Sequence, residues 1–143
     1  MIKCKFQDIE HAAKIVGNKT LPKIVFLLDN NTSYNCWGFT AYALQLVNKL
    51  YWMNIQTMEN ILRKYTKQVR KDKIKPGDIV VYRDYELLHT AIVISPKTNK
   101  MIHKDGYSPL EMLNIYKSCY IYSNKANVSF RRLKEDKLKL KCA

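Results

Sequence analysis

Cys36 and two histidines, His89 and His103, are the residues of this chain best suited to do chemistry. Cys36 lies in the segment Tyr-Asn-Cys-Trp-Gly-Phe-Thr, directly before a run of residues with amphipathic helical spacing. The first turn of a helix presents unpaired backbone N–H groups and a partial positive charge, and both favour a thiolate over a thiol. His89 opens the strand-like run His-Thr-Ala-Ile-Val-Ile, and His103 lies in Met-Ile-His-Lys. A cysteine at the start of a helix, followed by histidines on later strands, is typical of a thiol nucleophile with a base and an orienting group.

Each of these residues has an expected role. Cys36 is the expected nucleophile, and His89 is the base that takes the thiol proton. His103, on the next strand, is expected to bond the His89 ring and fix its tautomer. The backbone N–H of Cys36 would form part of an oxyanion hole, and Gly38 lets a substrate or a strand approach the backbone closely. The competing interpretation is a buried structural thiol beside structural histidines.

Other titratable residues are weaker candidates. Asp78, Asp84 and Asp105 are rival orienting groups for the base, but each occurs in a sequence that is typical of a turn. His11 has no comparable setting, so we interpret it as structural. We expect neither a metal nor another cofactor, because the four cysteines form no C-x-x-C pair.

The elements expected to position these residues divide into helices followed by strands. Helical spacing predicts helices over 8–16, 36–50 and 55–71, and more weakly over 20–28. After residue 71 the apolar residues no longer recur at helical spacing. Short β-branched runs separated by turn sequences predict an antiparallel meander. Its strands are expected at 79–82, 89–94 and 101–104. Residues 119–122 and 127–133 are expected to add one or two further strands. Between them, the sequence Ser-Pro-Leu-Glu predicts a capped short helix from residue 108 to about 117.

This order of elements predicts an α+β fold with N-terminal helices packed on a C-terminal antiparallel β-sheet. The length of 143 residues suits one domain, which we expect at 1–133, followed by a charged and frayed tail at 134–143. The N-terminus has no apolar run typical of a secretory signal, and no stretch has the length of a membrane span. We therefore expect a cytoplasmic protein, a protein exported without a classical signal peptide, or one domain of a longer chain.

The chain is strongly basic, with 25 Lys and Arg against 12 Asp and Glu. Such a surface favours anionic partners, including wall polymers. Lysine far outnumbers arginine and Ile, Asn and Tyr are abundant, a mix that an AT-rich genome would equally produce. We therefore interpret the charge as a generic solvated basic surface rather than a nucleic-acid site, and no recognised nucleic-acid motif is present.

Four motifs, taken in order, resemble one family. They are Tyr-Asn-Cys-Trp-Gly-Phe-Thr, Pro-Gly-Asp-Ile-Val-Val-Tyr, His-Thr-Ala-Ile-Val-Ile and Ile-His-Lys-Asp-Gly. Together they look like the NlpC-type branch of the papain-like cysteine peptidases, which includes bacterial and phage wall endopeptidases and their CHAP-type amidase relatives. The resemblance runs from Tyr34 to Gly106 and implies a papain-like fold. It also implies Cys36 as nucleophile, His89 as base and His103 as third polar residue.

The resemblance extends to the substrate side of the site, with differences. It implies Tyr34 as a helper of the oxyanion site. Trp37 and Gly38 stand where the family often has Ser-Gly, and they complete the expected oxyanion and substrate group. Asn35 stands where the family often has Asp, and the polar run 29–33 replaces the usual glycine-rich stretch.

The leading hypothesis is therefore a thiol hydrolase that cleaves an amide or peptide bond in peptidoglycan stem peptides through an acyl-enzyme. The first alternative is a papain-like effector or toxin, a protease or deamidase that acts on host or rival proteins. The second alternative is a basic module that binds nucleic acid, in which Cys36 is inert.

Overall fold

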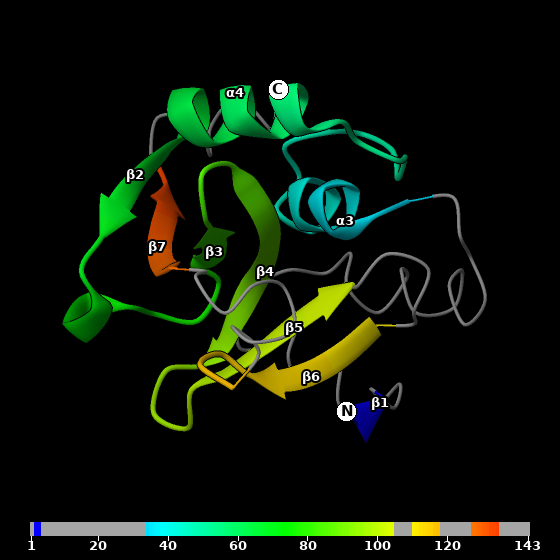
Figure 1. The fold of residues 1–143 in the computed structure, drawn as a ribbon. Helices are drawn as coiled ribbons and strands as arrows, with labels where there is room; N and C mark the ends of the chain where they lie inside the picture. The colour runs from blue at the N-terminus through cyan, green and yellow to red at the C-terminus, as the bar shows by residue number, and fades with distance from the viewer. Residues whose placement is uncertain (1, 4–33, 105–109, 118–126, 135–143) are drawn as a thin grey trace.

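The computed structural model describes residues 2–3, 34–104, 110–117 and 127–134 of the chain. These residues form two α-helices, α3 (Cys36–Ala43) and α4 (Ile55–Tyr65), and one antiparallel sheet of seven strands (Figure 1). The strands are β1 (Ile2–Lys3), β2 (Thr66–Val69), β3 (Ile79–Arg83), β4 (Leu87–Ser95), β5 (Lys100–Lys104), β6 (Leu110–Asn114) and β7 (Asn127–Leu133). Their order across the sheet is β1-β6-β5-β4-β3-β7-β2, and a short 3₁₀ turn, η1 (Lys71–Lys73), follows β2.

The predicted meander is confirmed. Strands β3, β4 and β5 are neighbours in the sheet, with Ile79 opposite Ile92 and Ile92 opposite Ile102. The strand expected at 127–133 is also confirmed as β7, which pairs with β3 on one side and β2 on the other. Short β-branched runs bounded by turns therefore predicted the centre of the sheet correctly.

The helices predicted over 36–50 and 55–71 are both shorter in the structure. The helix expected over 36–50 ends at Ala43, because Gln45 adopts a left-handed backbone with φ of 61° that redirects the chain. The helix expected over 55–71 ends at Tyr65, and the next four residues form β2 instead. Pairing of β2 with β7 supplies backbone hydrogen bonds that the helix would otherwise have made, so tertiary context overrides local helical spacing.

The helix predicted from residue 108 to about 117 is wrong within the described part, because Leu110–Asn114 is strand β6. This strand pairs with β5, and Glu111 lies opposite His103. Leu110 packs with the core on one face of the sheet, whereas Leu113 packs with the cluster on the other face. A short apolar run of this kind fits both the helical period of about 3.6 residues and the two-residue alternation of a strand. In this protein the run forms a strand.

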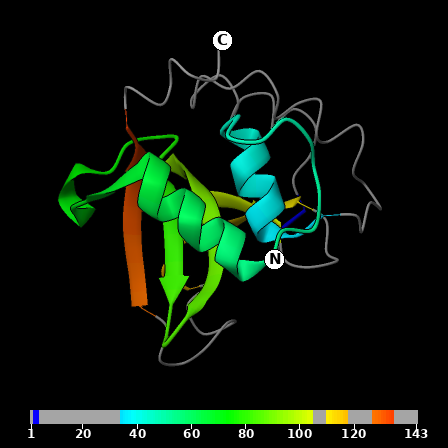
Figure 2. The same ribbon diagram turned by 90° about the horizontal axis from the view of Figure 1, so that it is seen from above.

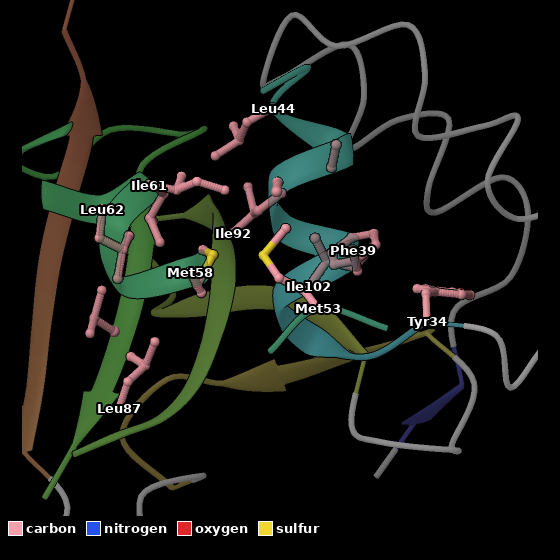
Figure 3. Packing of buried hydrophobic residues seen from close by; sticks show 14 of the residues in the cluster. Tyr34, Phe39, Leu44, Met53, Met58, Ile61, Leu62, Leu87, Ile92 and Ile102 are labelled. Atoms are coloured by element: carbon pink, nitrogen blue, oxygen red, sulfur yellow. The ribbon is translucent and has the colours of Figure 1, made fainter. Parts of the chain in front are cut away.

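The helices cover one face of the sheet (Figure 2). Alternating residues of β3, such as Ile79 and Val81, join the helices in one core cluster, whereas Val80 and Tyr82 belong to a second cluster on the opposite face. The first cluster contains residues from both helices, the sheet and the segment between the helices, as Figure 3 shows. The labelled members are Tyr34, Phe39, Leu44, Met53, Met58, Ile61, Leu62, Leu87, Ile92 and Ile102. The predicted α+β class is confirmed.

Several expectations fall outside the described residues. They concern the helices at 8–16 and 20–28, the strand at 119–122, most of the tail at 134–143, and residues Cys4, His11, Asp105, Cys119 and Cys142. Neither helix in the described ranges has the length and apolar character that a bilayer crossing requires.

Candidate active site

Cys36 is the first residue of α3, and the residue before it builds that helix end. The Asn35 side chain accepts a hydrogen bond from Gly38 N at 3.0 Å, which caps the helix. The same side chain accepts from Met53 N at 3.2 Å and donates to Met53 O at 2.8 Å. An amide can accept and donate in this way whereas a carboxylate only accepts, so Asn35 ties the helix start to the Met53 segment. The thiol of Cys36 is buried and forms no disulfide.

Gly38 allows the same segment to approach the helix. A Cβ at this position would lie 2.0 Å from the carbonyl oxygen of Tyr51, a distance that no side chain can occupy. The close approach expected at this glycine is thus made by the chain's own backbone. Asn35 and Gly38 together fix where α3 begins, and they therefore fix the backbone position of Cys36.

The two histidines meet inside the sheet. His89 lies on β4 and His103 on β5, and the register of these strands sets them diagonally across from each other. The distance from His89 Nε2 to His103 Nδ1 is 2.7 Å, and the two rings are nearly perpendicular, with an interplanar angle of 85°. Both side chains are buried. The hydrogen bond expected between His89 and His103 is therefore present in the structure.

Burial decides the charge of this pair. Loss of hydration, and to a lesser degree the charge of His103, holds the pKa of His89 well below its ordinary value of 6.5. Burial alone lowers the pKa of His103 to about 4. Both imidazoles are consequently neutral near pH 7, and each carries one N–H. A single proton then lies between Nε2 of His89 and Nδ1 of His103.

Two contacts bring the Cys36 segment against the strands that carry the histidines. Thr40, one helical turn after Cys36, forms a side-chain hydrogen bond of 2.9 Å with Thr90, the residue that follows His89. Two residues before Cys36, the ring of Tyr34 faces the ammonium group of Lys104 at 5.0 Å. Lys104 follows His103 directly. Successive side chains of a strand point to opposite faces, so Thr90 and Lys104 lie on the face that α3 covers. His89 and His103 lie on the other face, where the ring of His89 contacts Tyr82.

The chain matches the NlpC/P60 family over residues 25–132, which is 108 of its 143 residues. It belongs to the NlpC/P60 family. No curated protein matches the chain. NlpC/P60 members are cysteine peptidases and amidases that act on peptidoglycan or peptide substrates, so this protein is a hydrolase of that class. The matched span includes Cys36 and both histidines.

Glu111 is a residue of this NlpC/P60 protein that the sequence did not suggest for the site. Its carboxylate Oε2 lies 3.6 Å from Nε2 of His103, on the side of the ring opposite to His89, and its side chain is buried. The sequence assigned Glu111 to a helix cap. Its position between two apolar residues of an alternating strand was the available signal, because a buried carboxylate on a sheet face requires a polar partner.

The remaining predicted residues lie around the helix start. Tyr34 is fully buried, and burial raises the pKa of its hydroxyl, which therefore stays protonated. Among the residues that the structure describes, neither the Tyr34 hydroxyl nor the Trp37 indole N–H has a hydrogen-bond partner. Asp78, by contrast, accepts from Lys75 N at 2.8 Å and pairs with Arg132 at 2.8 Å, so its expected turn-capping role is confirmed.

Proposed function

We propose that this NlpC/P60 protein hydrolyses an amide bond in the stem peptide of peptidoglycan, with Cys36 as nucleophile, His89 as base and His103 as orienting group. The proposal is supported by the position of Cys36 at the capped start of α3, in a span that matches the NlpC/P60 family and includes both histidines. The two imidazoles point to the sheet face away from α3, so the reaction requires the His89 ring to turn toward Cys36. A neutral imidazole held at one nitrogen can use its other nitrogen as a base. In His89, Nε2 faces His103, so Nδ1 is the atom that receives the thiol proton.

The reaction has two halves. In the first, the Cys36 sulfur attacks the substrate carbonyl while its proton moves to Nδ1 of His89. The tetrahedral intermediate then breaks its C–N bond, and the proton on His89 leaves with the amine. In the second half, water attacks the thioester, gives a proton to His89, and the C–S bond breaks as that proton returns to sulfur. Backbone N–H groups at the start of α3, including that of Cys36, are the proposed donors to the oxyanion.

Burial of the pair favours proton transfer during the attack over a stable thiolate–imidazolium pair at rest. The sequence predicted such a resting ion pair. The low pKa of His89 means that its protonated form is disfavoured until a negative charge develops nearby. In this proposal, His89 therefore acts as a general base in the attack step.

The test is turnover of purified muropeptides by the wild type and by Cys36→Ala, with product amines measured by mass spectrometry. We expect the variant to lose at least about 1,000-fold in turnover and to keep its fold, since the Cys36 thiol supplies the covalent step. The matched control is Asp72→Ala, which truncates an exposed residue of the 3₁₀ turn after β2. Equal turnover by the wild type and Cys36→Ala would rule out Cys36 as the nucleophile. Cleavage of protein amides but not of muropeptides would favour the effector alternative.

The nucleic-acid alternative would use basic side chains, and two of the arginines near the end of β7 are already bonded within the protein. Arg132 pairs with Asp78, and Arg131 bonds the side chain and carbonyl of Thr66. Both guanidinium groups are therefore used within the fold. A DNA or RNA mobility shift that persists in Cys36→Ala would support that alternative.

A further inference from the structure

Three neighbouring strands carry a row of buried polar side chains. Glu111 lies on β6, His103 on β5 and His89 on β4, and Glu111 is directly opposite His103 in the register. The Glu111 carboxylate faces Nε2 of His103 at 3.6 Å, while Nδ1 of the same ring faces His89 at 2.7 Å. His103 thus stands between an acidic group and the proposed base, with one ring nitrogen toward each.

We propose that Glu111 is a positioning residue that fixes the protons of His103 and, through His103, those of the base His89. The inference rests on the proposed function of Cys36 and His89. It assigns the row Glu111–His103–His89 to the site, in place of a pair of histidines alone.

Glu111 would act by determining which nitrogens of the two imidazole rings carry protons. A carboxylate has no proton to donate, so it favours a proton on the nitrogen that faces it, Nε2 of His103. Neutral His103 then has its lone pair at Nδ1 and must accept from Nε2–H of His89. Neutral His89 consequently has its own lone pair at Nδ1, the nitrogen that a general base requires. The opposite arrangement puts a proton on Nδ1 of both rings, and His89 then cannot receive the thiol proton there.

The geometry requires a small closing movement. A distance of 3.6 Å between Glu111 and His103 exceeds hydrogen-bond length by a few tenths of an ångström. Contacts in catalytic sites are often long in the free enzyme and shorten when substrate binds.

The experiment uses the full chain labelled with ¹⁵N-histidine. Long-range ¹H–¹⁵N spectra at pH 7 report which nitrogen of each ring carries the proton. We expect Nε2–H on both His103 and His89 in the wild type. In Glu111→Met, which keeps the length of the side chain but removes the acceptor, we expect His103 to shift toward Nδ1–H. Glu111→Gln should lie between the two, since its amide offers either an oxygen or an NH₂ group.

Kinetics supply the second readout. Outer carboxylates that orient metal-binding imidazoles are worth about 10- to 100-fold, and we expect a fall of that size in kcat for Glu111→Gln with KM nearly unchanged. Glu59→Gln is the matched control, because Glu59 pairs with Arg83 in a surface ion pair outside the proposed site. It should leave kcat unchanged.

The outcomes separate this inference from the proposed function. If Cys36→Ala is inactive but wild-type His103 carries its proton on Nδ1, the inference is wrong and the thiol mechanism stands. An unchanged kcat in Glu111→Gln would overturn the inference in the same way. Full activity of Cys36→Ala would instead remove the proposed function on which the inference rests.

Discussion

Replacement of His103 tests the burial of the imidazole pair through its effect on stability at acid pH. The pKa of His103 falls from 6.5 to about 4 on folding, because the folded protein removes the ring from water. The unfolded chain therefore binds more protons between these two values. The stabilising contribution of neutral His103 is complete above pH 6.5 and is lost as the pH falls toward 4.

The magnitude follows from the same values. At 1.36 kcal/mol per pKa unit, the fall of the His103 pKa corresponds to about 3 kcal/mol of unfolding free energy between pH 7 and pH 4. His103→Gln keeps a polar side chain but does not titrate. We expect its unfolding free energy to decline about 3 kcal/mol less than that of the wild type over this range.

The assay is urea unfolding at pH 7, 6, 5 and 4, followed by far-UV circular dichroism. The quantity compared is the change with pH, because the substitution also alters absolute stability. Acidic groups elsewhere titrate in both proteins and cancel in the difference. Parallel pH curves for the wild type and His103→Gln would refute the reasoning, since they would mean that the ring is not buried in its neutral form.

Further predictions concern the helix start and the base. Gly38→Ala should destabilise the fold by about 3 kcal/mol in urea unfolding, because the added methyl meets the Tyr51 carbonyl, and wild-type stability would contradict this packing. Asn35→Asp should keep the helix cap but lose the bond to Met53 O, which costs about 1–3 kcal/mol in urea unfolding, and unchanged stability would contradict this bond. A lowered pKa of His89 predicts that the acidic limb of kcat/KM lies below pH 6.5, since the neutral base exists above its pKa. A limb at or above pH 6.5, measured where the protein is folded, would show that the base is solvated.

The sequence predicted the centre of the sheet correctly for a physical reason. Strands β3, β4 and β5 are short, β-branched and separated by tight turns, so local pattern and tertiary structure agree there. The contact expected between His89 and His103 on neighbouring strands is also present in the structure.

The parts that the sequence did not predict depend on contacts between distant segments. The residues after Tyr65 have helical spacing, but pairing with β7 turns them into a strand. Glu111 follows a capping pattern, but its role comes from lying opposite His103, which only the register of β5 and β6 determines. A local sequence pattern does not determine which residues lie opposite each other on neighbouring strands, so these features could not be predicted from the sequence.

The central claim is that the Cys36 sulfur forms the covalent intermediate, and trapping that intermediate tests it most directly. The enzyme would be mixed with a muropeptide, quenched in acid within the first turnover, and analysed by intact mass spectrometry and peptide mapping. The account predicts a thioester on Cys36 in the wild type, and much less of it in His89→Ala, which lacks the base. Product formation with no mass added to Cys36, or an acyl group on another residue, would contradict it.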